Sequence, residues 1–579
     1  MDNGEIAKVL REIGEYLEMQ DVAFKPRAYQ KAAEVIASFP EEAMSLYKKG
    51  GLKAVEEIPG VGISIAEKIE ELIKTGRCKF YDQLKKKTPV NLGELSAVEG
   101  LGPKKIKVLY QKLKIKNLID LEKAAKAGKI GKLEGFGPKS EENILKGIES
   151  VKKFSGRFAL PMILPTVQEI ADRLRSLKEV KKLEVAGSIR RRKETIGDAD
   201  ILVISNKPKP VMDYFVSLPE VARVYAHGDT KSAVQLKNGL DIDVRVVPEE
   251  SYGAALHYFT GSKDHNVAMR QLAIKKGYTI NEYGVFKGTK MAKEKRVAGR
   301  TEEEIYKLFD MDYIEPELRE ASGELVAASQ GKLPKLIGYD DLKGDLQVQT
   351  NWTDGEASIE EMANAAIKAG LEYILITDHT KRLAMTHGLD EKRIVQQWKE
   401  IDRLNSQFAI RNSQFRILKG TECDILKDGT LDLPDEILAK LDVVGASIHS
   451  YFNLSRAEQT ERLIRVMKNP HVDIVFHPTG RIVQRREPYE LDMEAIIKTA
   501  KATGTILEIN GSDRLHLKDQ HIRMCVEAGV KMAIDSDAHA PSQFSFLEYG
   551  IAQARRGWAE KKDIVNAWPL EKMLKMLKH

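Results

Sequence analysis

The most informative residues of this 579-residue sequence are a Gly-Ser turn and the basic pair that follows it. Gly187 and Ser188 come directly after an apolar run typical of a strand, and Arg190 and Arg191 come next. Backbone N–H groups at the start of a helix stabilise an anionic phosphate group. The turn therefore predicts a phosphate-binding site.

An aspartate pair follows this turn. Asp198 and Asp200 lie two positions apart in a β-branched run, so a strand would point both carboxylates to the same face. Neighbouring carboxylates repel each other unless cations lie between them, and hard divalent ions such as Mg²⁺ take oxygen ligands. A solvated aspartate pair at a strand end would look similar. Together with the Gly-Ser turn, however, the pair favours two-metal nucleotidyl transfer.

A third carboxylate should come from a neighbouring strand. The run 240–247 alternates polar and apolar residues, which puts Asp241, Asp243 and Arg245 on one face. We expect Asp243 to complete the catalytic set and Asp241 to be structural.

Length and composition limit the class of protein. A chain of this length predicts several domains. We find no apolar run of the ~18 residues that cross a bilayer, and the N-terminus does not resemble a signal peptide. Cys78, Cys423 and Cys525 show no metal or disulfide spacing. We therefore expect a cytoplasmic protein that does not contact membranes.

Charge is distributed unevenly along the chain, although the net charge is only +6. Residues 101–200 carry 24 Lys and Arg against 13 Asp and Glu, and the last ~240 residues are slightly acidic. This asymmetry suggests a polyanionic partner for the N-terminal part. A solvated, lysine-rich helix surface would give the same composition.

The N-terminal part contains a repeated element. Helical spacing begins within residues 5–50, and then an apolar residue, Gly-x-Gly and a helix start occur three times. The glycines of the three copies are Gly60, Gly62, Gly100, Gly102, Gly135 and Gly137. Glycine permits a tight turn, and the following helix exposes N–H groups to a phosphate. The three copies resemble helix-hairpin-helix elements, which bind the nucleic-acid backbone without reading its sequence.

The pattern changes after residue 183. Strands are expected up to residue 247, followed by a mixed segment, and residues 318–343 are polar enough to predict a linker. Beyond the linker, strands and helices alternate over ~230 residues, which predicts an α/β barrel-like domain.

Taken together, these motifs resemble a family X DNA polymerase of the polymerase-β type over residues 1–318. The order Gly-Ser-x-Arg-Arg, Asp-x-Asp and Asp-Val-Arg carries the resemblance, together with Tyr258-Phe259-Thr260-Gly261-Ser262, Asn266 and Arg270. The resemblance implies that Asp198, Asp200 and Asp243 hold two metal ions. It also implies that Asp243 accepts the proton of the primer 3′-hydroxyl.

The same resemblance assigns the substrate contacts. It implies that Gly187, Ser188 and Arg191 hold the triphosphate. Tyr258 and Phe259 would pack against the sugar and disfavour a 2′-hydroxyl, and Gly261 would belong to the same nucleotide-binding segment. Asn266 would meet the base edge and Arg270 the template minor groove. Lys263 departs from the animal repair enzyme, which has an acid there, so that enzyme's fidelity does not transfer to this chain.

The first ~85 residues resemble the family's 5′-phosphate-binding domain. The resemblance implies that Lys25, Tyr29 and Lys31 bind the 5′-phosphate. Lys68 matches the position of the Schiff-base nucleophile that acts on 5′-deoxyribose phosphate. A lysine that has lost its proton can attack an aldehyde carbon. Alternatively, Lys68 only neutralises phosphate.

Metal-type residues gather in the C-terminal part, mostly at the ends of expected strands. They are Asp354, His379, Glu422, His449, His477, Asp537 and His539. In a barrel of this class, strand ends meet at one face. The set resembles the PHP (polymerase and histidinol phosphatase) domain, whose metal ions hydrolyse phosphate esters. In family X polymerases, that domain can supply 3′–5′ exonuclease and AP-endonuclease activity.

One motif departs from the PHP pattern. The family begins with His-x-His, whereas this chain has Gln347 and Gln349. An amide oxygen binds Zn²⁺ far more weakly than imidazole does. We therefore expect fewer than three metal ions in this domain, and the sequence leaves open whether it is active.

The expected fold is multidomain. It comprises N-terminal all-α helix-hairpin-helix domains, an α+β polymerase-β-type nucleotidyltransferase palm and thumb, and a C-terminal α/β distorted barrel. The expected boundaries are 1–90 for the 5′-phosphate-binding domain, 91–155 for the helix-hairpin-helix domain, 156–255 for the palm, 256–317 for the thumb, 318–343 for the linker and 344–579 for the PHP domain.

The resemblance also implies cofactors and partners. The cofactors are Mg²⁺ or Mn²⁺ at the polymerase site, Zn²⁺ or Mn²⁺ at the PHP site, and Na⁺ or K⁺ at the helix-hairpin-helix elements. The partners are dNTPs and gapped or nicked DNA with a 5′-phosphate, as in base excision repair, and the chain would act as a monomer. Three alternatives are a template-independent nucleotidyltransferase, a DNA-end-binding scaffold with a vestigial PHP domain and, for the C-terminal half alone, a small-molecule phosphatase.

Overall fold

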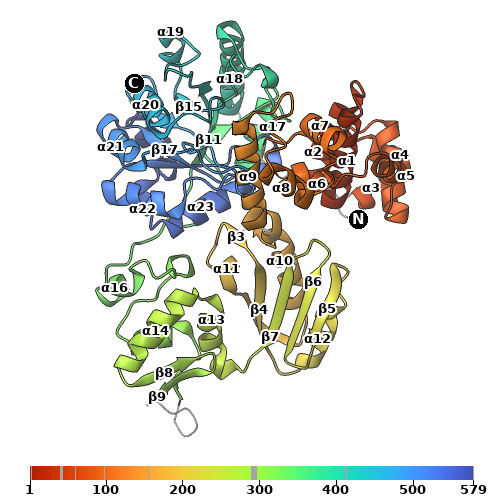
Figure 1. Cartoon of the computed structure of the whole chain (residues 1–579). Helices are drawn as coiled ribbons and strands as arrows, with labels where there is room; N and C mark the ends of the chain where they lie inside the picture. Colours follow the sequence, from red (N-terminus) through yellow and green to blue (C-terminus); the bar gives the residue numbers. More distant parts are fainter. Residues whose placement is uncertain are drawn as a thin grey trace. The chain divides into compact units, whose positions relative to one another are not determined.

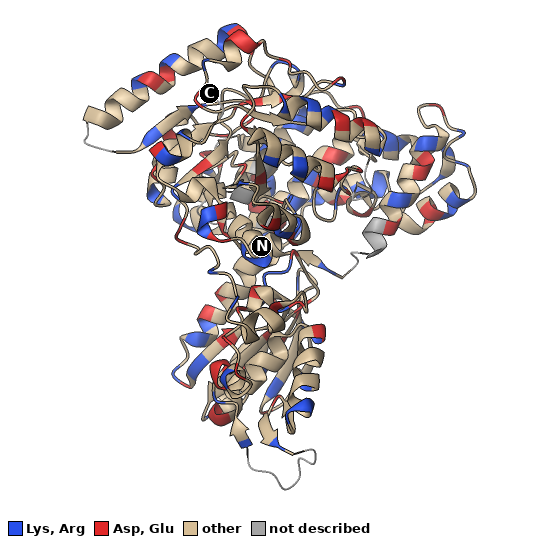
Figure 2. Ribbon diagram, turned by 90° about the vertical axis from the view of Figure 1, so that its left-hand side faces the viewer, with Lys and Arg blue, Asp and Glu red and all other residues tan. Residues whose placement is uncertain are grey.

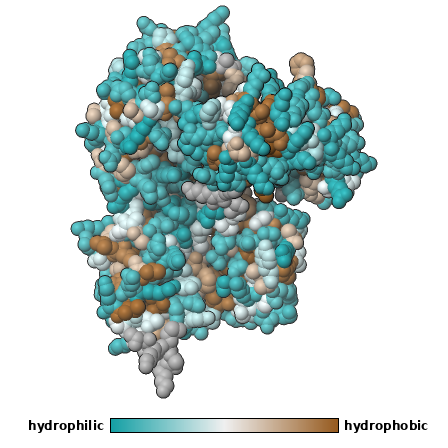
Figure 3. Space-filling view, in the orientation of Figure 1, coloured by the Kyte–Doolittle hydropathy of each residue, from teal (hydrophilic) through white to brown (hydrophobic). Residues whose placement is uncertain are grey.

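The computed structural model describes residues 1, 3–38, 43–58, 60–96, 98, 100–153, 156–288, 296–410 and 414–577 (Figure 1). It divides into two compact units, Met1–Ser155 with Gln484–Glu487, and Gly156–Val483 with Pro488–His579. Figure 2 shows Lys and Arg interspersed with Asp and Glu along the helices, and the face seen in Figure 3 is mostly hydrophilic.

The first unit is helical in its described residues. Its helices are α1 (Asn3–Met19), α2 (Lys25–Ser38), α3 (Ala43–Glu56), α4 (Ile63–Thr75), α5 (Lys79–Lys87), α6 (Leu92–Ser96), α7 (Pro103–Leu113), α8 (Leu118–Lys126) and α9 (Pro138–Lys153). Their apolar faces form one continuous core that includes Ile6, Ile69 and Ile106. Apolar residues at helical spacing produce this packing, because one face of each helix is removed from water.

The three Gly-x-Gly copies adopt the same turn. Gly60, Gly100 and Gly135 have φ values of 79°, 78° and 82°, a region that favours glycine. In each copy, the residue after this glycine donates its N–H to the carbonyl three positions earlier, and α4, α7 or α9 begins shortly afterwards. The turns therefore present three helix N-termini in the same way.

The second unit begins with a five-stranded sheet in the order β2-β4-β7-β6-β5. The strands are β2 (Val180–Val185), β4 (Asp198–Ser205), β5 (Val221–His227), β6 (Lys231–Leu236) and β7 (Asp241–Val246). The helices α10 (Leu160–Arg175) and α12 (Pro208–Val216) pack against it, and their apolar residues share one core with the strands. A small pair, β1 (Phe158–Ala159) and β3 (Thr195–Ile196), and the short helix α11 (Gly187–Arg190) complete this part.

The next segment combines helices with a small antiparallel sheet. Its elements are α13 (Tyr252–Thr260), α14 (Lys263–Lys275), β8 (Tyr278–Asn281), β9 (Gly284–Lys287), β10 (Arg296–Ala298), α15 (Glu302–Leu308) and α16 (Glu324–Ser329). The segment 318–343, interpreted as a linker with a possible short helix, contains the short helix α16 and buries Arg319 completely. Arg319 is buried because it pairs with Glu302.

The C-terminal part contains parallel strands in two sheets, β11-β12-β13 and β14-β15-β16-β17-β18. The strands are β11 (Gly344–Val348), β12 (Tyr373–Ile376), β13 (Arg416–Lys419), β14 (Glu422–Asp424), β15 (Gly445–Ser447), β16 (Ile474–Val475), β17 (Ile506–Asn510) and β18 (Met532–Asp535). Parallel bridges between Val348 and Ala538 and between His379 and Glu422 join the two sheets. This is the expected distorted α/β barrel.

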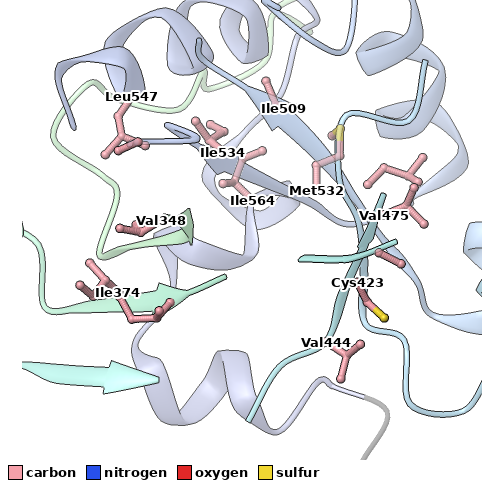
Figure 4. Close-up of a cluster of buried hydrophobic side chains, with 14 of the residues drawn as sticks. Val348, Ile374, Cys423, Val444, Val475, Ile509, Met532, Ile534, Leu547 and Ile564 are labelled. Carbon is pink, nitrogen blue, oxygen red and sulfur yellow. The ribbon is translucent and has the colours of Figure 1, made fainter. Parts of the chain in front are cut away.

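Helices surround these sheets. They are α17 (Ile359–Lys368), α18 (Glu391–Ile410), α19 (Asp435–Leu438), α20 (Arg456–Met467), α21 (Met493–Thr503), α22 (Asp519–Ala528), α23 (Leu547–Arg556) and α24 (Leu570–Leu574). Figure 4 shows Val348, Ile374, Cys423 and Ile534 among the side chains of the core. No helix in the described ranges is both long and apolar enough to cross a membrane.

Candidate active sites

The three carboxylates expected at the palm lie on adjacent strands. β4 and β7 pair in parallel, with Asp200 opposite Asp243 and Asp198 opposite Asp241. Since alternate residues of a strand share a face, all four carboxylates lie on the same face of the sheet. Asp241 accepts a hydrogen bond from Gln235 Nε2 at 3.2 Å, in keeping with a structural role.

Charge accumulates at this carboxylate group. Burial, followed by the nearby negative charges of Asp198 and Asp243, raises the pKa of Asp200 to about 6. The negative charge of Asp243 is partly balanced by two cations, Lys231 Nζ at 3.1 Å and Arg245 Nη2 at 3.2 Å from its carboxylate. A site with excess negative charge and only oxygen donors fits hard divalent cations.

The Gly-Ser turn lies directly beside these carboxylates. Gly187 has φ 68°, and a Cβ at this position would lie 3.2 Å from Asp200 Oδ2. Ser188 follows inside α11. Glycine is therefore required at this position both by its backbone angle and by the approach of Asp200. The turn and the metal-type carboxylates form one site.

Arg191 lies where α11 meets α13. Its Nη1 donates to the carbonyl of Thr260, and a Cβ on Gly261 would come within 3.1 Å of the same nitrogen. Its Nε donates to Glu320 Oε1 at 3.1 Å, and Glu320 also accepts from Arg556 of α23. The arginine expected to hold the triphosphate is thus oriented by contacts from several segments.

Sequence reasoning did not find the buried network behind Arg191. Arg190 donates to Glu302 Oε2 at 2.7 Å and to Thr260 Oγ1 at 2.8 Å, and Glu302 also pairs with buried Arg319. Burial would raise the pKa of Glu302, but the two guanidinium groups outweigh it and hold that pKa well below its usual range. This ion network fixes the turn to α13 and α15.

The expected base- and template-contacting residues also lie together. Tyr258, Asn266 and Arg270 line one small cavity. Asn266 Nδ2 donates to the carbonyl of Tyr258 at 2.7 Å, and Arg270 lies 5.5 Å from the centre of the Tyr258 ring. The Phe259 ring contacts the Tyr258 ring edge-on, with centroids 5.1 Å apart, and Arg245 lies 4.7 Å from the centre of the Phe259 ring. Phe259 therefore connects the cavity to the strand that carries Asp243.

In the first unit, Tyr29 and Lys68 share one neighbour, Phe80. The Tyr29 ring stacks on Phe80 at 6.5 Å, and Lys68 Nζ lies 5.1 Å from the same ring. Lys68 Nζ also donates to the carbonyl of Ser64 at 2.8 Å. Burial raises the pKa of Tyr29 to about 12. The aromatic pair therefore forms one wall beside the lysine amine.

The remaining expected DNA contacts of the first unit lie at its surface. The Lys31 side chain passes Gly60, where a Cβ would lie 3.6 Å from Lys31 Cγ. Lys25 is exposed at the first position of α2. A Cβ at Gly62, Gly100, Gly102, Gly135 or Gly137 would meet open space. Surface backbone of this kind is accessible to a phosphate.

The C-terminal part brings the metal-type residues into two overlapping groups. One contains Asp354, His379 and His539, and the other His379, Glu422 and His449, with potential ligand atoms within 4.8 Å of one another in each group. His477 Nε2 lies 2.7 Å from Glu422 Oε1. Imidazole and carboxylate donors at such spacing fit transition-metal ions.

Electrostatics supports this grouping. Burial would raise the pKa of Glu422, but His379 and His449 hold it well below its usual range. Burial disfavours a charged His449, yet Glu422 and Asp424 raise the pKa of that imidazole to about 9. Asp424, which the sequence analysis did not single out, contacts His449 Nδ1 at 3.2 Å. Its proximity arises from the parallel pairing of β14 and β15.

Gln347 and Gln349 lie inside this site and are fully buried. Gln349 Nε2 donates to Glu422 Oε2 at 2.8 Å, and Gln347 Oε1 accepts from Asn510 Nδ2 at 3.1 Å. Asn510 also donates to Asp537 at 3.2 Å. Amide hydrogen bonds therefore occupy the part of the site where the family has two imidazoles.

A polymerase-β-like phosphate turn, an aspartate triad and a C-terminal histidine and acid cluster define the class of the protein. Family models match at residues 1–78 (helix-hairpin-helix domain), 255–320 (DNA polymerase beta thumb) and 345–519 (PHP domain).

Curated relatives agree with this class. The chain is 39% identical to "DNA polymerase/3'-5' exonuclease PolX" of Bacillus subtilis over 100% of both chains. The C-terminal part is also similar to two proteins named probable phosphatase. It is 33% identical to that of Caldanaerobacter subterraneus over 32% of this chain and 70% of the relative, and 34% identical to that of Thermoanaerobacter sp. over 32% and 73%. The chain belongs to the bacterial PolX family of family X DNA polymerases.

Proposed function

We propose that this protein is a DNA-directed DNA polymerase that fills short gaps during DNA repair, with metal-dependent 3′–5′ excision in its PHP domain. The main observation that supports polymerase activity is the register of β4 and β7, which places Asp200 opposite Asp243 and beside the Gly187 turn. The B. subtilis relative, which is named as both a polymerase and an exonuclease, supports both activities.

In this proposal, Asp198, Asp200 and Asp243 hold two Mg²⁺ or Mn²⁺ ions, which stabilise the charge that develops on the transferred phosphoryl group. Asp243 accepts the proton of the primer 3′-hydroxyl. Ser188 and Arg191 bind the triphosphate, and Arg191 is pre-oriented by Thr260 and Glu320. A pre-oriented cation loses little conformational freedom when substrate binds.

The contacts to the nucleotide and template follow from the cavity. Tyr258 and Phe259 pack against the sugar and disfavour a 2′-hydroxyl, and Gly261 leaves room beside Arg191. Asn266 meets the base edge and Arg270 the template minor groove. The shared cavity lining of Tyr258, Asn266 and Arg270 supports these roles.

The first unit would hold the 5′-phosphate side of the gap. Lys25, Tyr29 and Lys31 bind the 5′-phosphate, and the three Gly-x-Gly turns bind the DNA backbone, with Na⁺ or K⁺ at their carbonyl groups. Lys68 acts as the nucleophile on 5′-deoxyribose phosphate. The position of Lys68 Nζ beside Phe80, which stacks on Tyr29 of the expected phosphate-binding set, supports this role.

The PHP domain would bind Zn²⁺ or Mn²⁺ through its seven histidine and acid residues. We expect fewer than three ions, because the two glutamines are held in amide hydrogen bonds. Excision should therefore be weak, absent or strictly Mn²⁺-dependent. Incision at abasic sites is a further expected activity. The partner is gapped or nicked DNA, the chain acts as a monomer, and the reaction takes place in the cytoplasm, where bacterial DNA lies.

The test is extension of a 5′-phosphorylated gapped duplex with one dNTP and Mg²⁺, while excision of the same labelled primer is followed with Mn²⁺. We expect extension by one nucleotide per one-nucleotide gap. Binding without extension would instead indicate a DNA-end-binding scaffold. Extension that ignores the template base would indicate a template-independent nucleotidyltransferase.

A second candidate concerns the C-terminal part alone. Its similarity to proteins named probable phosphatase favours hydrolysis of a small phosphate monoester. Parallel assays of a small monoester and of a labelled DNA 3′ end separate the two activities. Faster turnover of the monoester would favour the phosphatase.

A further inference from the structure

The strongest unassigned feature of the PHP site is a guanidinium group inside it. Arg514, in the loop after β17, places its Nε 3.4 Å from Asp537 Oδ2, and Asp537 belongs to the expected metal ligands. Among the described residues, the terminal nitrogen Nη1 of Arg514 is buried and has no hydrogen-bond partner. Thus one edge of this guanidinium is held by a carboxylate, while a donor on it remains unused.

The surroundings of Arg514 hold its charge in place. An arginine keeps its positive charge in proteins, and Asp537 fixes one edge of this guanidinium. Asp537 also accepts a hydrogen bond from Asn510, which donates to Gln347, so Arg514 lies at the end of the site that contains the two glutamines.

The same end of the site has lost metal-binding capacity. Gln349 donates its amide to Glu422, and Gln347 and Asp537 share the amide of Asn510. Two imidazoles that would anchor a metal ion are absent here, whereas the groups of Asp354, His379 and His539 and of Glu422 and His449 are intact. A phosphate ester at this end would meet less metal charge than elsewhere in the site.

We propose that Arg514 binds a non-bridging oxygen of the scissile phosphate in the PHP site and supplies the fixed positive charge at the end where Gln347 and Gln349 replace histidine. A guanidinium presents several donors in a rigid plane, so Arg514 can hold Asp537 through one edge and a phosphate oxygen through another. The ligand class is a phosphate ester, either a phosphodiester or the dianion of a phosphomonoester. This inference rests on the proposed excision function of the same site.

The first test measures phosphate binding rather than turnover. Full-length protein loaded with Mn²⁺ is titrated with inorganic phosphate in a calorimeter, and wild type is compared with Arg514→Gln and Arg514→Lys. A hydrogen bond to a charged group corresponds to about tenfold or more in affinity. We expect Arg514→Gln to weaken phosphate binding at least tenfold and Arg514→Lys to restore part of it. Other anion sites of the chain are the same in all variants and cancel in the comparison.

Two controls separate a direct role from a structural one. Arg523→Gln removes a cation on α22 that pairs with Glu527 and should leave phosphate affinity unchanged. Elemental analysis should give the same Mn²⁺ content for Arg514→Gln as for wild type, because Arg514 is not a metal ligand. Unchanged phosphate affinity in Arg514→Gln, or affinity lost only together with bound metal, would overturn the proposal.

A double-mutant comparison tests the link to the glutamines. In the background of Gln347→His with Gln349→His, the two imidazoles would hold a further metal ion that supplies positive charge at this end. Arg514→Gln should therefore weaken phosphate binding by a smaller factor than in wild type. An equal factor in both backgrounds would contradict compensation. If wild type shows no excision but Arg514→Gln still weakens phosphate binding, the proposed excision function fails while the phosphate contact stands.

Discussion

The palm site and the PHP site both gather groups that favour metal ions, but they are built differently. The palm carboxylates lie on two paired strands, are partly exposed, and are balanced by Lys231 and Arg245. The PHP ligands come from the ends of several strands, and Glu422 at their centre is only 1% exposed. One site is an open carboxylate face, and the other is an interior cluster.

This difference affects how each site tolerates substitution. In the palm, the all-oxygen set of donors is partly exposed to solvent, an arrangement that suits hard divalent cations. In the PHP site, histidines and acids hydrogen-bond to one another, and glutamines continue this network through Glu422 and Asn510. The interior site therefore keeps a hydrogen-bonded interior with glutamine at positions 347 and 349. We expect the palm site, in contrast, to depend on Asp198, Asp200 and Asp243.

The largest effect should follow from Asp243→Ala. This change removes a carboxylate that faces Asp200 across paired strands. We expect primer extension to fall by ~10³-fold or more, about 4 kcal/mol of transition-state stabilisation, while binding to gapped DNA stays within a few-fold. Single-nucleotide gap filling and a gel-shift titration measure the two quantities. The matched control Asp241→Ala, two residues away, should keep most of the extension activity. If Asp243→Ala extends primers at more than a tenth of the wild-type rate, Asp243 is not a catalytic carboxylate.

The second effect separates the two sites. Glu422→Ala removes the carboxylate that contacts His379, His449 and His477. We expect Mn²⁺-supported excision to fall ~10²-fold because the cluster loses its shared acid, while extension stays within twofold. The exposed Glu436 provides a control, since Glu436→Ala removes an acid from the same domain without touching the cluster. Equal losses of extension and excision would mean that both activities use the palm.

Much of the palm could be predicted from the sequence because its chemistry is local. Asp198, Asp200 and Asp243 lie in two short runs whose alternation alone places them on one face, and the structure pairs those runs. The Gly-Ser turn ends at Ser188, only ten positions before β4 begins at Asp198. What the sequence could not show is the support for Arg191, because Glu320 and Arg556 are distant in the chain.

The PHP site was less predictable for a related reason. Histidines at strand ends stand out, but Asp424 looks like an ordinary surface acid until the pairing of β14 with β15 places it beside His449. Arg514 looks like a solvated loop cation until Asp537 approaches it. Arg319 similarly appeared to lie in a polar linker, yet it is buried because Glu302 neutralises it. Ion pairs between segments that are distant in the chain leave no local sequence pattern from which they could be predicted.

The third prediction extends the comparison to the first unit. A 5′-phosphate on the downstream side of a gap should tighten binding by roughly tenfold at low salt, and added salt should remove most of that gain. Fluorescence anisotropy with and without the phosphate measures it. Lys68→Ala should abolish borohydride trapping of 5′-deoxyribose phosphate, and Lys68→Arg should abolish trapping but retain phosphate binding. If wild type forms no trapped adduct, Lys68 is only a phosphate ligand.

The smallest expected effect is on the pH dependence of folding stability in the metal-free protein, which depends on the charge of the palm carboxylates. Burial and the charges of Asp198 and Asp243 raise the pKa of Asp200 from 3.8 to about 6, so the folded state holds the proton more tightly than the unfolded state does. The stability contributed by this protonation is fully present below pH ~4 and is lost as the pH rises through about 6. Because Asp200 is partly exposed, we expect about 1 kcal/mol less stability at pH 7 than at pH 5 from this group.

Urea unfolding in EDTA at both pH values should show the decrease in wild type and a smaller one in Asp200→Asn. Mg²⁺ should reduce the loss of stability between pH 5 and pH 7 in wild type, because it neutralises the same carboxylates. An equal loss of stability in wild type and in Asp200→Asn would mean that the palm carboxylates do not repel one another in the folded state.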